Sequence, residues 1–335
     1  MATVNASRRG GERSVVLPYW LDRPADEAVA IASTAEAAGF RSLWVGEMAT
    51  FDAFALATAI GLRAPRLRLR IGPLAIATGL RTPIAIALGM ASVATVTPAR
   101  ADVALGASSP AIVRGWHDRP WEGLPRQMRE TVQVLRGLFA GERADLDGRR
   151  VRTRGFRLQR PLSDVTIAVA AFGPAMTRVA AETADVVVLN LVAPTHVATV
   201  RAAIDAHARD AGREPPRLAV WVPVALDPGP ATIRQLASQI AVYLRPPGYG
   251  EMFTALGFGA LVADARGGRP RAELAAVVPR ELLAAVGAVG DAGEIAARIA
   301  AYVDAGADDV ALVPATAEDP AAARVLTAVA PQTTT

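Results

Sequence analysis

The sequence predicts an α/β protein with the fold of a (β/α)8 barrel. Short apolar runs rich in valine, isoleucine and leucine alternate with longer alanine-rich runs, and this alternation is typical of parallel strands covered by helices. Eight strand–helix units can be counted along the chain, which is the number that closes a barrel. The GxGxxG fingerprint of a doubly wound dinucleotide-binding sheet is missing after the first strand, which ends in Pro18-Tyr19-Trp20.

The first four predicted strands are separated by regular helices. Gly39 is expected to end the first helix, because glycine tolerates the left-handed conformation found at helix ends. Pro83 is expected to begin the third helix, because a first turn does not need the amide that proline lacks. The predicted strands are residues 14–18, 42–45, 69–75 and 101–106, and the predicted helices are residues 25–38, 54–63 and 83–96.

A longer segment interrupts this rhythm after the fourth strand. Residues 107–124 are predicted to form a loop and residues 125–139 an amphipathic helix. The polar residues 141–162, which include Gly148 and Gly155, predict a hairpin. The fold is therefore expected to carry an insertion after strand four.

The second half of the chain resumes the alternation of strands and helices. Residues 228–289 are predicted to be mostly helical, with breaks at Pro246-Pro247-Gly248 and Gly267-Gly268, and they make a second insertion after strand seven. The expected organisation is a flexible tail at 1–13, a single barrel domain at 14–330 and a flexible tail at 331–335. The remaining predicted strands are residues 165–170, 186–189, 218–225 and 309–313, and helices are predicted from Gly173-Pro174, over 194–211, over 292–305 and near the end of the chain.

Composition excludes several classes of protein. The chain has no cysteine and only three histidines, which excludes a disulfide framework, a thiolate nucleophile and an iron–sulfur cluster and argues against a metal centre. The net charge is +4, but the 36 basic residues are all arginine and are scattered, so no nucleic-acid partner is expected. Residues 1–13 lack the apolar core of an export signal, and residues 84–96 are too few to span a bilayer. We therefore expect a cytoplasmic protein with no membrane partner.

In a (β/α)8 barrel the active site is built from the loops that follow the strands, and these loops supply the candidate residues. Glu47 follows strand two and is either an acid–base catalyst or a hydrogen-bonding partner of neighbouring loops. His117 follows strand four and is either a structural residue or a catalytic acid. Tyr19 and Trp20 follow strand one and form either a flat wall for a ring system or a cap on the barrel.

Two further features lie in these loops. Trp116 and Trp121 flank the histidine loop and either anchor it by packing or line an apolar pocket. Gly173 and Pro174 open the helix after strand five, where free amides and the positive end of the helix dipole favour a phosphate group. No HExxH motif is present and the acidic residues lack metal-ligand spacing, so no metal site is predicted.

Five phrases of the chain occur in a characteristic order and cover nearly all of it. They are AEAAGFRSLWVGEMATFDAF at 35–54, the segment 64–106, ASSPAIVRGWHDRPWEGLPRQMRETVQVLRG at 107–137, AVAAFGPAMTRVAAETADVVVLN at 168–190, and AVGDAGEIAARIAAYVDAGADDVALVP at 288–314. Taken together, they resemble the bacterial luciferase-like superfamily. Within it, the GWH-x-RPWE phrase is similar to the coenzyme F420-dependent oxidoreductases.

This resemblance implies a (β/α)8 barrel of the bacterial luciferase-like type, a homodimer and a small-molecule substrate. It implies coenzyme F420 as the cofactor, with FMN as the alternative. By position, residues 72–78 would pass beside the ring, with a non-prolyl cis peptide between Leu74 and Ala75. The other implied cofactor contacts are Ser108 and Ser109 at the ring or ribityl chain, Gly173, Pro174, Ala175 and Met176 at the phosphate, and Asn190 near the tail; the implied substrate pocket is Trp20, Met48, Trp116 and Trp121.

Two positions depart from the pattern of well-known F420-dependent dehydrogenases. Met48 stands where they carry a histidine, and Ser108 or Ser109 where they carry a glutamate. The resemblance therefore implies hydride transfer from C5 of reduced F420 to a C=C or C=N bond rather than oxidation of an alcohol or sugar. The proton would come from His117, Glu47, Tyr19 or water. The alternatives are an FMN-dependent monooxygenase that uses O2 and a non-catalytic partner protein with the same fold.

Overall fold

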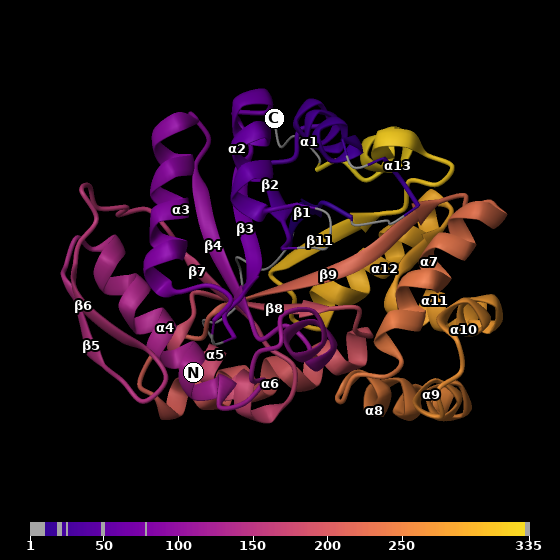
Figure 1. Cartoon of the computed structure of the whole chain (residues 1–335). Helices are drawn as coiled ribbons and strands as arrows, with labels where there is room; N and C mark the ends of the chain where they lie inside the picture. Colours follow the sequence, from indigo (N-terminus) through magenta and orange to yellow (C-terminus); the bar gives the residue numbers. More distant parts are fainter. Residues whose placement is uncertain (1–10, 19–21, 25, 48–50, 78, 332–335) are drawn as a thin grey trace, which may run out of the picture. The chain divides into compact units, whose positions relative to one another are not determined.

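The computed structural model describes residues 11–18, 22–24, 26–47, 51–77 and 79–331 (Figure 1). The chain divides into two compact units. Unit 1 comprises residues 1–40, 189–201 and 218–335, and unit 2 comprises residues 41–188 and 202–217. Of the predicted tails at 1–13 and 331–335, residues 1–10 and 332–335 lie outside the described residues, and the prediction of a single domain over 14–330 stays a prediction.

Unit 2 is built on parallel strands that pair in chain order, β2 with β3, β3 with β4, β4 with β7 and β7 with β8. Every residue of β2 and β4 is buried, as expected for strands with both faces covered. The strands are β2 (Ser42–Val45), β3 (Arg68–Ala75), β4 (Ala101–Gly106), β7 (Ile167–Ala170) and β8 (Val186–Asn190), and the helices are α2 (Ala53–Arg63), α3 (Pro83–Val96), α4 (Leu124–Phe139), α5 (Pro174–Thr183) and α6 (Pro194–Asp210), the last shared with unit 1.

Unit 1 contains parallel strands in the order β10, β9, β11, β1. Its strands are β1 (Glu12–Val16), β9 (Arg217–Leu226), β10 (Ala288–Gly290) and β11 (Asp309–Pro314). Its helices are α1 (Glu27–Ala37), α7 (Pro230–Tyr243), α8 (Tyr249–Phe253), α9 (Gly259–Arg266), α10 (Arg271–Val277), α11 (Arg280–Val286), α12 (Ala292–Asp304) and α13 (Ala323–Ala328), with a π-helix η2 (Thr254–Phe258) and a 3-10 turn η3 (Pro320–Ala322).

Along the described chain, β1, β2, β3, β4, β7, β8, β9 and β11 are each followed by helical structure, and this succession confirms the predicted (β/α)8 barrel. The predicted bounds of residues 42–45, 83–96 and 101–106 agree with β2, α3 and β4. The predicted hairpin is β5 (Ala144–Asp147) with β6 (Arg152–Phe156), and the helices α8 to α11 form the insertion after strand seven.

Three predictions of local structure need correction. The strand β1 begins at Glu12 rather than Ser14, because Glu12 and Arg13 continue the parallel ladder opposite Asp309 and Val310, so the flexible tail cannot reach residue 13. Residues 288–290, predicted as the end of a helical run, form β10 because they pair with β9. Within the predicted loop at 107–124, residues 111–116 form the π-helix η1 (Ala111–Trp116).

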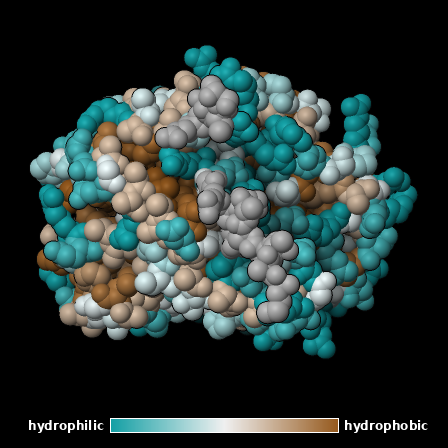
Figure 2. All heavy atoms as spheres, turned by 180° about the vertical axis from the view of Figure 1, so that it is seen from behind, coloured by the Kyte–Doolittle hydropathy of each residue, from teal (hydrophilic) through white to brown (hydrophobic). Residues whose placement is uncertain are grey.

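Large hydrophobic side chains reach the surface at a few places. Figure 2 shows one face, on which brown hydrophobic residues gather in patches between teal hydrophilic ones. Among the described residues, no helix is both long enough and apolar enough to cross a membrane. The exposed large hydrophobic residues are Leu62, Leu88, Val96, Trp116, Val242 and Val277.

The turn of the β5–β6 hairpin is held by one carboxylate. Glu130 of α4 accepts hydrogen bonds from the amides of Arg149, Arg150 and Val151, at 3.1, 2.8 and 2.8 Å. Burial alone would raise the pKa of the Glu130 carboxyl, but the three amides outweigh it, and the pKa lies below its ordinary value. The hairpin is therefore fixed to α4 by charge-assisted hydrogen bonds.

We expect Glu130→Gln to loosen this turn, because a neutral amide accepts these bonds less strongly and places an N–H group among donors. The expected loss is about 1–3 kcal/mol of the free energy of unfolding. Because the folded-state pKa is the lower one, the stabilisation exists above pH ~4.3 and disappears as the pH falls through the folded-state pKa. Hydrogen exchange of residues 144–156 and thermal unfolding at descending pH measure both effects.

The control is Glu214→Gln, since Glu214 is exposed and lies outside the hairpin, and the substitution removes the same charge from the same unit. An equal loss of hairpin protection in the two variants would contradict the assignment to Glu130.

Candidate active site

The carboxyl ends of four neighbouring strands in unit 2 carry most of the candidate residues. Glu47 follows β2, Leu74 and Ala75 end β3, Ser108 and Ser109 follow β4, and Gly173-Pro174 follows β7. Ala75 lies opposite Gly106, and Leu105 lies opposite Val169, so the carboxyl ends of β3, β4 and β7 are aligned with one another. Because parallel strands end at the same edge of a sheet, these residues share the edge where barrel enzymes place their active sites.

The end of β3 departs from regular strand geometry. The pairing with β4 shifts between Ile71 and Leu74. Gly72 has a φ of 122°, and a side chain at this position would collide with the carbonyl of Ala104. The cis peptide bond of the described residues is Gly72–Pro73, which corrects the position implied by the family resemblance, Leu74–Ala75. The cis bond lies at this position because Pro73 follows Gly72, and cis peptide bonds are almost confined to bonds that precede a proline.

Side chains hold the backbone where the ladder between β3 and β4 ends. Glu47 accepts a hydrogen bond from the amide of Ala75 at 2.6 Å. Gln127 of α4, which is 5% exposed, donates to the carbonyl of Ile76 at 2.5 Å. The indole of Trp121 donates to the carbonyl of Ala107 at 3.1 Å. Each bond satisfies a backbone group that the sheet no longer pairs.

Glu47 is also the first member of a charged chain. Its second carboxylate oxygen accepts from Nε of Arg81 at 2.5 Å, and Arg81 donates through a terminal nitrogen to Asp52 at 2.5 Å. Asp52 caps α2 by accepting from the amides of Phe54 and Ala55, both at 3.0 Å. Burial would raise the pKa of the Asp52 carboxyl, but Arg81 and these amides lower it below its ordinary value. Both oxygens of Glu47 thus serve neighbouring loops, which is the second of the two roles considered for it.

The fourth loop places its candidates in different surroundings. Ser108 is exposed with a φ of 59°, and the hydroxyl of Ser109 accepts from the amide of Ile112 at 3.4 Å. Trp121 is partly buried through its bond to Ala107, whereas the Trp116 side chain is 63% exposed. His117 is exposed at the end of η1. The structure thus brings Trp121 to the strand ends and leaves His117 and Trp116 facing solvent.

The start of α5 offers free amides. Gly173 has a φ of 83° and precedes Pro174, the first helical residue. The amides in the first turn of a helix have no acceptor within the helix. Pro174 has no N–H group, so the amides concerned here are those of Ala175 and Met176. The first turn has no acidic residue, and no atom of the described residues lies within 4 Å of the point where a Cβ of Gly173 would stand. This edge can therefore bind an external anion.

The same sequence opens α7 in unit 1, where it binds a carboxylate of the chain itself. Gly229-Pro230-Ala231 repeats Gly173-Pro174-Ala175, and Glu318 accepts from the amide of Thr232 at 2.9 Å. The amide and hydroxyl of Thr232, together with the amide of Ala231, hold the pKa of the Glu318 carboxyl below its ordinary value. The Gly-Pro-Ala start of α7 therefore accommodates a carboxylate of the chain itself.

Asn190, at the end of β8, belongs to unit 1 and contacts the insertion after strand seven. Its side chain hydrogen-bonds the phenol of Tyr249, whose ring centre lies 4.9 Å from that of Tyr243. Burial raises the pKa of the Tyr249 phenol far above its ordinary value, so the group stays neutral. Asn190 thus ties the carboxyl end of β8 to α8.

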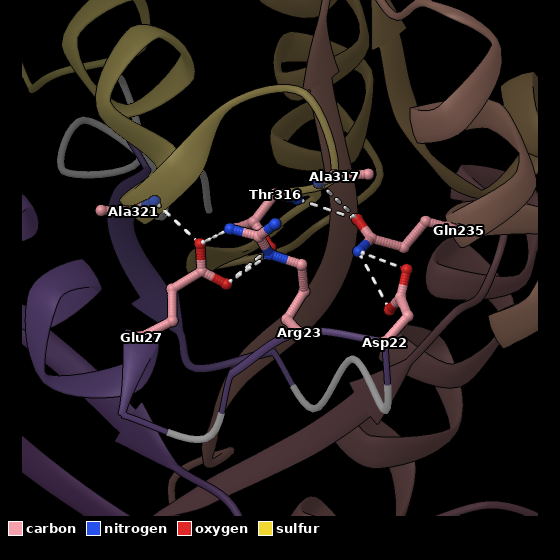
Figure 3. Close-up of polar contacts among 7 residues, drawn as sticks. All are labelled: Asp22, Arg23, Glu27, Gln235, Thr316, Ala317 and Ala321. Carbon is pink, nitrogen blue, oxygen red and sulfur yellow. Dashed lines mark hydrogen bonds and ion pairs between the residues drawn. The ribbon is translucent and has the colours of Figure 1, made fainter.

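A second polar network lies at the loops that follow β1 and β11 (Figure 3). Glu27, whose side chain is 9% exposed, pairs with Arg23 at 2.6 Å and accepts from Thr316 and from the amide of Ala321, both at 3.0 Å. Gln235 of α7 accepts from the amide of Thr316 at 2.8 Å and donates to Asp22 at 3.3 Å. Asp22 and Arg23, in the loop after β1, are thus held by Gln235 of α7 and Glu27 of α1.

Tyr19, Trp20 and Met48 lie outside the described residues. The structure adds Arg81, Gln127 and Gln235, which the sequence did not single out. Gln127 could have been found from the sequence, because it is a glutamine at an apolar position of a predicted helix. Arg81 and Gln235 could not, because their partners are distant in the sequence. Among the described residues, no group of three or more histidine and acidic side chains is placed to hold a metal ion.

Comparison with known proteins finds curated relatives that are named as reductases and dehydrogenases. The chain is 25% identical over 227 residues to a 5,10-methylenetetrahydromethanopterin reductase of Methanolobus tindarius, covering 66% of this chain and 69% of that one. It is 31% identical over 174 residues to the F420-dependent glucose-6-phosphate dehydrogenase of Mycobacterium avium, covering 48% of this chain and 51% of that one. The match therefore spans about half the length of the dehydrogenase.

Solved structures share the fold over nearly the whole chain. A coenzyme F420-dependent tetrahydromethanopterin reductase from Methanopyrus kandleri superimposes with a TM-score of 0.80 at 19% identity, covering 95% of this chain and 98% of that one. An F420-dependent secondary alcohol dehydrogenase, solved with an F420-acetone adduct, gives a TM-score of 0.75 at 18% identity and covers 96% and 98%.

The family model of the luciferase-like monooxygenases matches residues 3–309, from before the first strand into the last. The predicted phrases, the strand order and the edge of candidate residues agree with this match, and the chain belongs to the luciferase-like monooxygenase family.

Proposed function

We propose that the protein is an oxidoreductase that uses coenzyme F420 to reduce a C=C or C=N bond of a small molecule. The observation that carries the proposal is the helix start of α5 beside the ends of β3 and β4, in a chain that has F420-dependent oxidoreductases, so named, among its relatives. When bound, reduced F420 supplies a hydride from its C5 carbon. The protein's own residues bind the group, orient it and supply a proton.

The residues at this edge fit such a cofactor. The amides of Ala175 and Met176 would hold a phosphate, as the matching amides of α7 hold Glu318. The absence of a side chain at Gly173 leaves the approach open. Leu74 and Ala75 would form the surface beside the ring, with Ser108 and Ser109 as polar neighbours.

The proton source is proposed to be His117, with Tyr19 as the alternative. An imidazole both donates and accepts protons near neutral pH, and the exposed loop of His117 leaves its ring unencumbered by core packing. Glu47 is less suited to this task, because its two oxygens bind Ala75 and Arg81. Full turnover by His117→Ala would exclude this role. Trp116 and Trp121 are proposed to contact the substrate.

FMN-dependent monooxygenation is the second candidate, because the helix start of α5 would accept the phosphate of either cofactor and because a solved neighbour of the same fold is an EDTA monooxygenase. We expect purified protein titrated with F420 and, separately, with FMN to bind F420 at least about tenfold more tightly, which corresponds to ~1.4 kcal/mol. Fluorescence quenching measures both affinities. Tighter FMN binding together with O2 uptake would overturn the proposal in favour of the monooxygenase.

We expect Ala175→Glu to weaken F420 binding by about tenfold or more, because a carboxylate at this helix start competes with the phosphate for the same amides. The same change should leave the melting temperature equal or slightly higher, because acidic residues stabilise a first turn. Ala300→Glu adds the same charge at an exposed helical position of α12 and serves as the control. Equal affinities of the two variants would place the phosphate elsewhere.

A homodimer is proposed through the outer faces of α2 and α3. Leu62, Leu88 and Val96 are 61%, 49% and 54% exposed, and α3 contains no charged residue. Such an uncharged surface is typical of a protein–protein interface, and a second copy of the chain is the proposed partner.

We expect Leu88→Glu to shift the protein from dimer to monomer, because the dimer would have to bury an unpaired carboxylate at its interface. Light scattering coupled to size-exclusion chromatography measures the mass. Val277→Glu, at an exposed hydrophobic residue of α10, is the control and should stay dimeric. A monomeric wild-type protein would refute the proposal directly.

A further inference from the structure

Arg81 joins three elements that lie apart in the sequence. It contacts Glu47 after β2 and Asp52 before α2, both at 2.5 Å, and its guanidinium lies 5.3 Å from the ring centre of Phe54. Glu47 in turn holds the amide of Ala75. A single side chain from the loop after β3 therefore connects the end of β3 to the start of α2.

The contacts are more than a surface ion pair. Exposed pairs contribute little, because water and salt screen them. Here the side chains of Arg81 and Glu47 are only 19% and 22% exposed, and the guanidinium uses two different nitrogens for two carboxylates. The planar guanidinium, with two donor nitrogens at fixed angles, forms a fork that fixes the orientation of both carboxylates. A lysine ammonium, which acts as a single point charge, does not.

Arg81 also joins two acidic residues that lie five positions apart in the sequence. They are Glu47, which follows β2, and Asp52, which precedes α2. One partner is bonded to the last residue of β3 and the other to the first turn of α2. The two bonds of the guanidinium therefore fix Glu47 relative to Asp52, and through Glu47 they fix the position of the Ala75 backbone.

We propose that Arg81 is a positioning residue of the reaction, acting through Glu47 on the backbone of Ala75 beside the cofactor ring. The inference rests on the proposed function, because it assigns the end of β3 to the ring. Arg81 touches neither substrate nor cofactor in this role. It holds the ring's neighbour in place, while the phosphate is held by α5, so its loss should disturb the orientation of the ring more than the affinity for the cofactor.

The test compares wild type, Arg81→Gln, Arg81→Lys and the control Arg152→Gln, with oxidised F420 as the probe. Arg152 lies in the same unit and its side chain is 71% exposed. Fluorescence titration gives the Kd, and circular dichroism in the visible band of the bound cofactor, at saturation, reports how the ring is held. For Arg81→Gln we expect a Kd within about threefold of wild type and a dichroism signal reduced by about half or more.

Arg81→Lys retains the charge without the fork and should recover part of the signal, and Arg152→Gln should match wild type. An Arg81→Gln protein with the full dichroism signal would overturn the inference, and so would a parallel loss of signal, affinity and melting temperature in both Arg81 variants. Hydrogen exchange of the ligand-free protein provides the second measurement, with faster exchange expected at the Ala75 amide in Arg81→Gln.

Failure of the proposed function gives a different result. Wild-type protein that does not bind F420 overturns the cofactor assignment and the positioning role together. Binding by wild type with unaltered ring signal and unaltered Ala75 exchange in Arg81→Gln overturns the positioning role alone.

Discussion

The candidate site depends on how the backbone is satisfied where the parallel ladder of unit 2 ends. Beyond Ala75 and Gly106 the strands no longer pair regularly, and each unpaired buried amide or carbonyl would cost about 1–3 kcal/mol. Glu47, Gln127 and Trp121 supply the missing partners. The strand ends can therefore stay irregular, with the bulge at Gly72 and Pro73, and still present one fixed surface to a ligand.

The two Gly-Pro-Ala helix starts show one local structure used in two ways. At α7 the free amides are satisfied by Glu318, from the loop after β11, and the helix start is closed by the chain itself. At α5 the first turn has no acidic residue, and the space at Gly173 is open. The difference lies in a distant residue rather than in the helix, so a helix start becomes a ligand site only when the fold leaves it without an acid.

Elements with strong periodicity and clear end signals were predictable, as β2, β4 and α3 show with their agreeing bounds. The short strand β10 was missed because three residues carry no period, and only pairing with β9 defines them. The strand edge that carries the site also followed from the sequence, since barrel sites lie at strand ends. The roles of Arg81 and Gln235 did not, because their partners lie 29 or more residues away.

The same long-range contacts bear on the chemistry. A carboxylate after strand two suggests a catalytic acid when only the sequence is known, but Arg81 neutralises Glu47 and the amide of Ala75 orients it. The family resemblance implies a histidine and a glutamate at the positions of Met48 and of Ser108 or Ser109 in alcohol- and sugar-oxidising members, and this sequence has neither residue there. Reduction of a polarised double bond needs only one proton, delivered after the hydride, and a histidine on an exposed loop or water can supply it. Under the proposed function, the charges at the end of β3 therefore serve to orient the cofactor rather than to activate a hydroxyl group.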